Sequence, residues 1–419
     1  MASETSKQTS EPVHLLLCRA RRSFRAGKFM SVTNGLRSVS VVGTGMVRFG
    51  RFPEVSLPQL AAPAVIEALD EAGIDRSRIG AMYCGTVSGG PLAAQRIARE
   101  TGLTGIEAAN FENACSSSAS AFRHAWLAIA AGAVDCAVVV GAEQLTRLGG
   151  GPLDLGDEDV EAANGLTMPA LYAMRAQRYM HEFDLSPRDL AQIAVKARAN
   201  GALNPYAQIR STISVDEVLG SRQVASPLTL HQCCPLGDGA SAVVLAASGL
   251  AIANRQGAVT ILASHLTSGR YMQGGRDMTT PEVTMRCANE TYESCGIGPS
   301  DIDLVECHDA FTIAELLYYE ALGFARHGEG AGLIREGQTS LNGRIPFNPS
   351  GGLLCRGHPL GASGIAQIVE ITRQLQGRCG ARQVAKDKSR GPRIGLAHIT
   401  GGGTYGFDHG ACAIHILGR

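Results

Sequence analysis

Net charge is the first property that this sequence lacks. Its 419 residues carry 38 basic and 38 acidic side chains, so the formal net charge at pH 7 is zero. Nucleic acid is held by a basic field, and we therefore expect no nucleic-acid partner. No run of about 18 apolar residues occurs either, so no membrane span is predicted.

The cysteines lack the spacing of a metal site. The 12 cysteines are scattered, and no Cys-x-x-Cys pair or His/Cys set has zinc spacing, so we predict no metal. A chain of this length needs no disulfide framework, and we interpret the cysteines as free thiols in a reducing compartment.

Residues 1–37 differ from the rest and are predicted to be an N-terminal extension. They contain a basic cluster that includes Arg19, Arg21 and Arg22, but Glu4 and Glu11 argue against a targeting segment. If the extension is a disordered tail, we expect a cytoplasmic protein. If it is a targeting segment, we expect a mitochondrial or peroxisomal protein. The chain does not end in the peroxisomal Ser-Lys-Leu signal.

The rest of the chain alternates strand and helix patterns. A hydrophobic content of 45% with 18% charged residues indicates a globular protein. Apolar runs predict strands, and apolar residues at helical spacing that stop at a glycine predict helices. The predicted strands are 39–42, 81–87, 135–141, 259–263, 303–307, 394–398 and 411–417, and the predicted helices are 57–72, 116–131, 282–295 and 361–377. This order is typical of an α/β fold, with a mostly parallel sheet and helices on both faces.

The two halves of the chain echo each other. Residues 67–85 match residues 290–308 at an offset of 223 positions, and the segment that begins at Cys115 resembles the one that begins at His358. Together these matches predict a duplicated half-domain with pseudo-two-fold symmetry. In such a fold Cys115 and His358 lie at equivalent helix starts and face each other.

The duplication divides the chain into three parts after the extension. We predict an N-terminal half at 38–150, an inserted loop region with a return to the core at 151–250, and a C-terminal half at 251–419. Helical patterns at 167–183 and 186–200 lie in the insert, the second with an N-terminal Ser-Pro start. We expect the insert to form a lid or to face a dimer partner.

Four segments carry the residues of a reactive site. Cys115 precedes a helix pattern, where N–H groups stabilise a thiolate and an oxyanion, although a buried packing cysteine is the plainer alternative. His358, in a glycine-rich loop, is placed to take a proton, although it equally fits a helix cap. His308 follows a buried strand, where ligand sites collect, or it is a structural histidine. Gly401 and Gly402, in a run of three glycines, either leave backbone amides open to a ligand or form an ordinary turn.

These segments, in this order, resemble the thiolase family over residues 38–419. The resemblance rests on Cys115-Ser-Ser, His308-Asp-Ala-Phe311, Gly357-His-Pro-Leu-Gly-Ala-Ser-Gly364 and the C-terminal glycines, and it is nearest to the sterol-carrier-protein-type and archaeal acetoacetyl-CoA branch. It implies a duplicated five-layer α-β-α-β-α fold with an inserted loop subdomain.

The resemblance also implies a reaction. Cys115 attacks a coenzyme A thioester, His358 takes its proton, and an acyl-enzyme forms. His308 and His358 bind the thioester oxygen of the second substrate, and the amides of Cys115 and Gly401 bind the acyl-enzyme oxygen. The implied ligands are acyl-CoA and CoA as substrates with no permanently bound cofactor, and the implied assembly is a homodimer or homotetramer.

The sequence departs from the family at one residue. Thiolases carry a second cysteine that moves the proton at the carbon nucleophile, but Ile399 and Ala310 stand at its two known positions. By proximity in sequence, Cys355, His398 and Tyr405 are candidates to replace it.

Several functions remain open. The leading hypothesis is 3-ketoacyl-CoA thiolysis or acetyl-CoA condensation. The first alternative is an acyltransferase or retro-aldolase subunit that acts with a small partner protein on a CoA thioester such as that of a sterol side chain. A β-ketoacyl synthase and a non-catalytic lipid carrier are further alternatives. The residues that bind substrate along the CoA chain are not identified by the sequence.

Overall fold

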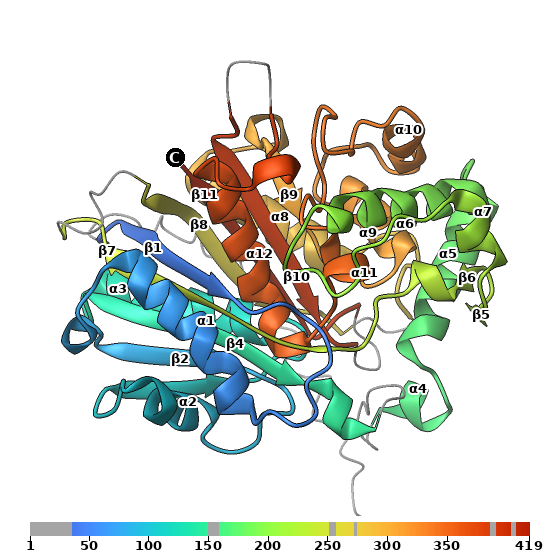
Figure 1. The fold of residues 1–419 in the computed structure, drawn as a ribbon. Coiled ribbons are helices and arrows are strands. Elements are labelled where there is room, and N and C mark those ends of the chain that lie inside the picture. The colour runs from blue at the N-terminus through green and yellow to red at the C-terminus, as the bar shows by residue number, and fades with distance from the viewer. Residues whose placement is uncertain (1–35, 150–158, 251–256, 272–274, 386–390, 404–407) are drawn as a thin grey trace, which may run out of the picture. The chain divides into compact units, whose positions relative to one another are not determined.

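A nine-stranded mixed sheet forms the centre of residues 37–419 (Figure 1). The structure is a computed structural model that describes residues 36–149, 159–250, 257–271, 275–385, 391–403 and 408–419. The predicted extension at 1–37 therefore lies almost entirely outside the described residues, and so does Tyr405.

The sheet consists of two sets of strands. The order across it is β3-β2-β4-β7-β1-β8-β11-β10-β9. The first set is β1 (Val39–Met46), β2 (Ala81–Gly85), β3 (Glu107–Phe111), β4 (Cys136–Gln144) and β7 (Asp238–Ala247). The second set is β8 (Val259–Ser268), β9 (Leu304–Glu306), β10 (Ile394–Gly401) and β11 (Ala411–Gly418).

The two sets repeat the same pairing, as the sequence echo predicts. Strands β2 and β4 are parallel, as are β9 and β10, while β7 is antiparallel to β4 and β1 just as β11 is antiparallel to β10 and β8. Strands β1 and β8 join the sets, with Ser40 opposite Thr260 and Val41 opposite Val259. The pseudo-two-fold relation therefore passes between β1 and β8.

The prediction of a mostly parallel sheet was wrong. Only the β2–β3, β2–β4 and β9–β10 pairs are parallel, and the other five are antiparallel. A strand buried on both faces appears as a continuous apolar run whatever the direction of its neighbours, so the sequence pattern does not report direction. Strand β11 follows β10 after residues 402–410, with no described helix between them, and a short connection of this kind reverses the chain.

The helices form three layers: a middle layer that packs on both sets of strands, and one further layer on each set. Together with the two sets of strands they make up the five-layer fold. The middle layer is α3 (Ser117–Ala131) with α12 (Leu360–Leu375); these two helices pack on each other and on strands of both sets (Figure 1). The first set is covered by α1 (Leu57–Ala72) and α2 (Ala93–Thr101), and the second by α8 (Glu282–Cys295), which is followed along the chain by α9 (Thr312–Ala321). Two short helices, α10 (Gly330–Arg335) and α11 (Gly352–Arg356), precede α12.

Local signals account for the helix boundaries. Helices α1 and α8 have the predicted bounds, because Gly73 and Gly296 end them in the left-handed conformation with φ of 58° and 69°. At the start of α12, Gly361 is required by close approach, since a Cβ there would lie 2.6 Å from the Cα of Thr86. The middle helices thus come close to the strand ends.

The connection between β4 and β7 forms a mainly helical insert. It contains α4 (Val160–Ala163), α5 (Met168–Glu182), α6 (Pro187–Ala202), α7 (Val215–Gly220), β5 (Gln223–Ala225) and β6 (Leu228–Thr229). Helix α6 packs on α9 and α11, so the insert supports the loop that leads to His358. The predicted domain boundaries, and the role of the insert as a lid or dimer face, stay predictions. Among the described residues, no helix is long and apolar enough to cross a membrane.

Short 3₁₀ turns complete the elements. They are η2 (Arg76–Arg78), η3 (Leu145–Leu148), η4 (Leu230–Gln232), η5 (Pro299–Asp301) and η6 (Gly380–Arg382).

Candidate active site

Cys115 lies in a tight turn directly before α3. Ala114 has a φ of 49°, which is unusual for a residue with a side chain. The turn is closed by bonds from the N–H of Ser116 to the carbonyl of Asn113 (3.0 Å) and from the N–H of Ser117 to the carbonyl of Ala114 (3.1 Å). The backbone therefore fixes the position of Cys115 at the start of α3.

The glycines after β10 lie against this turn. The backbone N–H of Gly402 lies close enough to the Cys115 sulfur to lower the pKa of the thiol. A Cβ on Gly401 would lie 2.0 Å from the carbonyl oxygen of Asn113, so only glycine fits there. Both predicted glycines are thus at the site, but the amide that reaches the sulfur belongs to Gly402 rather than to Gly401.

The contacts of His358 define which of its nitrogens is free. Its Nδ1 lies 2.8 Å from the hydroxyl of Ser363. That hydroxyl donates its proton to the carbonyl of Pro359 (2.9 Å), so it accepts from His358. We assign the proton to Nδ1 of His358, which leaves the lone pair of Nε2 directed into the site.

His308 has the opposite arrangement. Its Nδ1 accepts the backbone N–H of Thr400 (3.2 Å) and lies 2.5 Å from the Thr400 hydroxyl. An acceptor Nδ1 places the proton of a neutral ring on Nε2. That Nε2 is 3.3 Å from Nε2 of His358, so His308 presents a donor where His358 presents an acceptor.

The three predicted side chains meet at one point. One ligand-type atom from each of Cys115, His308 and His358 lies within 4.8 Å of the others. Cys115 precedes α3 and His358 precedes α12, which are the two equivalent middle helices. His308 follows β9 and reaches them from the second set of strands.

Burial keeps this cluster neutral. Burial raises the pKa of Cys115 to about 12, against the opposing effect of the Gly402 amide. Burial also lowers the pKa of His358 to about 3, with a smaller contribution from Arg356. The amides at the helix start favour the thiolate, but loss of water outweighs them in the resting site. A base is needed to ionise the thiol.

A Cys-His-His cluster is also a set of metal ligands, and among the described residues it is the one group with that geometry. The hydrogen bonds argue against a metal. If Nε2 of His308 bound a metal, the proton of the neutral ring would have to be on Nδ1. Two N–H groups would then face each other, because the N–H of Thr400 already points at Nδ1. The prediction of no metal remains a prediction.

Two acidic residues, Asp309 from the His308 motif and Glu143, which sequence patterns did not single out, link the segments that carry the two histidines. Asp309 accepts the N–H of Leu353 at 2.7 Å and so links the His308 segment to α11. Glu143 accepts the N–H groups of Val87 (2.9 Å) and Gly361 (3.0 Å), which ties the end of β4 to the start of α12. The only sequence signal for Glu143 is that it is a charged residue at the end of an apolar run.

The two usual positions of a second cysteine hold apolar side chains. Ile399 packs beside Cys115 with Ala119 and Ala413, and Ala310 is buried. Neither side chain carries a proton that it can transfer.

The candidates from sequence proximity have other partners. The thiol of Cys355 donates to the carbonyl of Ile209 at 2.9 Å. Nε2 of His398 lies 3.1 Å from the hydroxyl of Thr284, away from Cys115. Tyr405 lies outside the described residues.

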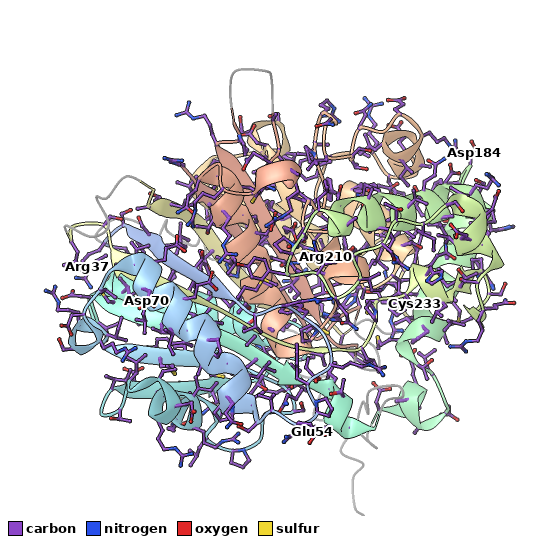
Figure 2. All side chains as sticks on the ribbon, in the orientation of Figure 1. Arg37, Glu54, Asp70, Asp184, Arg210 and Cys233 are labelled. Carbon is purple, nitrogen blue, oxygen red and sulfur yellow. The ribbon has the colours of Figure 1, made fainter. Side chains whose placement is uncertain are left out.

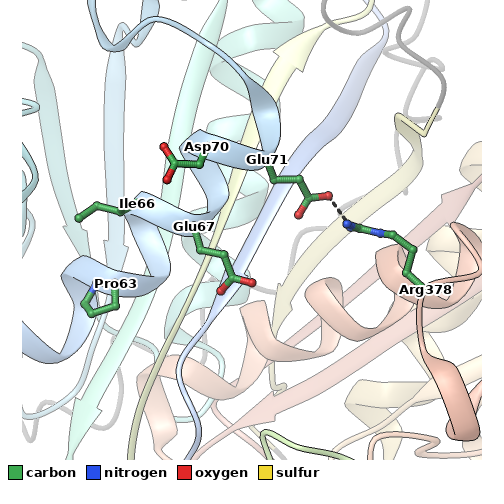
Figure 3. Close-up of a pocket in the computed structure, with 6 residues that line it drawn as sticks. All are labelled: Pro63, Ile66, Glu67, Asp70, Glu71 and Arg378. Atoms are coloured by element: carbon green, nitrogen blue, oxygen red, sulfur yellow. Dashed lines mark hydrogen bonds and ion pairs between the residues drawn. The ribbon is translucent and has the colours of Figure 1, made fainter.

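A surface depression lies apart from this cluster, between α1 and the turn after α12 (Figure 3). Its lining includes Glu67, Asp70 and Glu71, and Arg378 is paired with Glu71. This acidic lining repels phosphates, so the depression is not a site for the CoA phosphates.

Comparison with known proteins agrees with the fold. The model of the thiolase N-terminal domain matches residues 39–249, and that of the thiolase C-terminal domain-like family matches residues 264–415. The chain belongs to the thiolase family, and its similarity to thiolases and acetyl-CoA acetyltransferases indicates an acyltransferase.

Two relatives and one solved structure illustrate the similarity. Benzoylsuccinyl-CoA thiolase subunit BbsB of Thauera aromatica is 40% identical over 88% of this chain and 95% of its own length. An acetyl-CoA acetyltransferase of Methanothermobacter thermautotrophicus is 37% identical over 92% and 100%. The structure of an Ltp2-ChsH2(DUF35) aldolase superposes with a TM-score of 0.78 at 26% identity, over 92% of this chain and 98% of that one.

Proposed function

We propose that this thiolase-family enzyme transfers acyl groups from coenzyme A thioesters through an acyl-enzyme on Cys115. The observation that carries the proposal is the complementary pair of imidazoles beside the thiol, with an acceptor Nε2 on His358 and a donor Nε2 on His308. A neutral thiol beside a neutral base is the starting state for general-base attack.

In the first step the lone pair of His358 takes the proton of Cys115 as the sulfur attacks the thioester carbonyl. The N–H groups of Cys115 and Gly402 stabilise the oxyanion. The protonated His358 then returns its proton to the sulfur of CoA, which leaves, and the acyl group stays on Cys115.

In the second step the acyl group passes to an acceptor. The N–H of His308 donates to the thioester oxygen of the second substrate and stabilises its enolate. In condensation the acceptor is a second acetyl-CoA. In 3-ketoacyl-CoA thiolysis Cys115 instead attacks the 3-keto carbon, acetyl-CoA leaves as the bond between C2 and C3 breaks, and CoA is the acceptor of the acyl group. The relatives' names, which refer to benzoylsuccinyl-CoA and acetyl-CoA, support CoA thioesters as substrates.

The decisive experiment is the intact mass of purified protein after mixing with acetyl-CoA. We expect a gain of one acetyl group in the wild type and no gain in Cys115→Ala. A matched control is Cys136→Ala, which removes a buried thiol in β4. A mass gain that persists in Cys115→Ala would refute the proposal.

A second candidate is an acyltransferase or retro-aldolase subunit that works with a small partner protein. It is favoured by the similarity to the Ltp2-ChsH2(DUF35) aldolase, whose name includes a DUF35 component, and to BbsB, which is a subunit of benzoylsuccinyl-CoA thiolase. The presence of Cys115 argues against an aldolase that forms no acyl-enzyme. Full turnover by the purified chain alone would remove the requirement for a partner.

We also propose the homodimer or homotetramer that the family resemblance implies. Light scattering of the eluting protein tests it directly, and a monomeric mass at micromolar concentration would refute it.

A further inference from the structure

We infer that Cys234 supplies the second thiol of this active site and moves the proton at the α-carbon of the CoA-bound acetyl group. The inference rests on the proposed function and assigns its missing acid–base group. The observation behind it is a short antiparallel bridge between the segment before β7 and the His308–Phe311 segment.

The bridge brings Cys234 opposite Ala310. Cys233 pairs with Phe311 as an antiparallel bridge, and the N–H of Cys234 bonds to the carbonyl of Ala310 at 2.8 Å. Figure 2 labels Cys233 on this segment. Residues directly opposite in an antiparallel pair direct their side chains to the same face, with Cβ atoms about 4.5–5.5 Å apart. The Cys234 thiol therefore stands beside the methyl of Ala310, which occupies one of the two positions of the second cysteine.

The surroundings of Cys234 fit an acid–base role. Its side chain is half-buried, and its pKa is raised by burial and then by its neighbours Cys233, Cys115 and Asp309. The Cys115 thiol is thus close enough to act on it electrostatically. A thiol that stays protonated at rest is ready to donate.

The other nearby thiols are less suitable. Cys233 donates to the carbonyl of Thr229 at 3.5 Å and Cys355 to that of Ile209 at 2.9 Å, while Cys307 is fully buried and accepts from Asn348 at 3.4 Å. Within the described ranges, the Cys234 sulfur makes no hydrogen bond to another residue. Its proton is therefore available to a substrate.

The hydroxyls near His308 are less suitable. Tyr318 lies 3.3 Å from the hydroxyl of Thr400, and Tyr172 lies 2.8 Å from Nε2 of His409. Burial raises the pKa of Tyr172 to about 12. These hydroxyls form a chain of hydrogen bonds behind His308 that orients its ring. Their protons are used within that chain.

The step balances in both directions. In thiolysis the thiolate of Cys115 attacks the 3-keto carbon, the bond between C2 and C3 breaks, and the S–H of Cys234 protonates the C2 carbanion to give acetyl-CoA. The Cys234 thiolate then takes the proton of the protonated His358. The neutral His358 accepts the proton of the incoming CoA thiol as its sulfur displaces the acyl group, and returns that proton to the sulfur of Cys115. In condensation, after acylation, the S–H of Cys234 passes its proton to the neutral His358, and the resulting thiolate removes the methyl proton of acetyl-CoA.

The test separates the two half-reactions. Acetyl-CoA is mixed with protein in D₂O, and deuterium in the acetyl methyl group is followed by NMR while acetylation of Cys115 is followed by intact mass. In Cys234→Ala and Cys234→Ser we expect exchange to fall about 10²- to 10⁴-fold, the usual contribution of an acid–base group, with acetylation unchanged. The matched control Cys233→Ala keeps both.

Each result has a clear meaning. Exchange in Cys234→Ser and Cys234→Ala within twofold of the wild type overturns the inference but leaves the proposed function standing. Exchange that is absent in a wild type that still acetylates Cys115 also overturns it. No acetylation of the wild type overturns the proposed function itself. Recovery of exchange when Ala310→Cys is added to Cys234→Ala supports the location of the thiol, and lack of recovery counts against it.

Discussion

Removal of the base His358 has a consequence that can be worked out in numbers. With a Cys115 pKa of about 12, only about 10⁻⁵ of the thiol is ionised at pH 7. Attack in His358→Ala depends on that fraction, so the loss of acetylation rate at pH 7 is at most about 10⁵-fold. A positioned general base typically contributes 10² to 10⁴, and we expect a loss in that range.

The pH dependence distinguishes this mechanism from a preformed thiolate. Burial lowers the pKa of His358 to about 3, so its Nε2 is unprotonated throughout pH 5–9 and the wild-type rate is flat there. In His358→Ala the rate rises about tenfold per pH unit over the same range, because thiolate is lost as pH falls below the raised thiol pKa.

The assay is acetylation of Cys115 by acetyl-CoA, quenched at short times and read by intact mass between pH 5 and 9. His181→Ala, which changes an exposed histidine at the end of α5, serves as the control. A wild-type rate that itself rises tenfold per pH unit, or a pH-independent rate in His358→Ala, would show that the neutral thiol–imidazole pair is not the reacting state.

Three further predictions concern the same cluster. Ser363→Ala leaves the buried Nδ1–H of His358 unpaired, which costs about 1–3 kcal/mol, so acetylation slows about 5- to 150-fold without loss of fold by circular dichroism. Gly401→Ala forces a methyl group against the carbonyl of Asn113, and overpacking of this kind costs about 1–3 kcal/mol of stability. The midpoint of thermal unfolding therefore falls in Gly401→Ala. It does not fall in the control Gly332→Ala, where a Cβ has open space. Treatment with EDTA leaves acetylation unchanged, and a loss restored by Zn²⁺ would contradict the assigned His308 tautomer.

The sequence alone was sufficient for features encoded in short windows. Helices α1 and α8 have the predicted bounds because the apolar spacing and the glycine at each C-terminus act within a few residues. The duplication was visible because its two copies keep the same local pattern. The choice of Cys115, His308 and His358 followed from the same local segments and the family resemblance.

The sequence did not predict whether neighbouring strands run parallel or antiparallel. Both faces of β7, β10 and β11 are buried, and an apolar run of this kind looks the same in a parallel and an antiparallel sheet. Candidates chosen by proximity in sequence also misled, since Cys355 lies three residues from His358 yet bonds to Ile209.

The sequence by itself determined the ends of α1 and α8 and the two-fold repeat, and it selected the candidate residues Cys115, His308 and His358, because each depends on neighbours along the chain. Only the tertiary structure decided the protonation of the two imidazoles, which depends on Ser363 and Thr400, and the neutral state of Cys115, which depends on burial. It also brought Cys234 beside Ala310, 76 positions further along the chain, because pairing across an antiparallel bridge joins residues that share no local pattern.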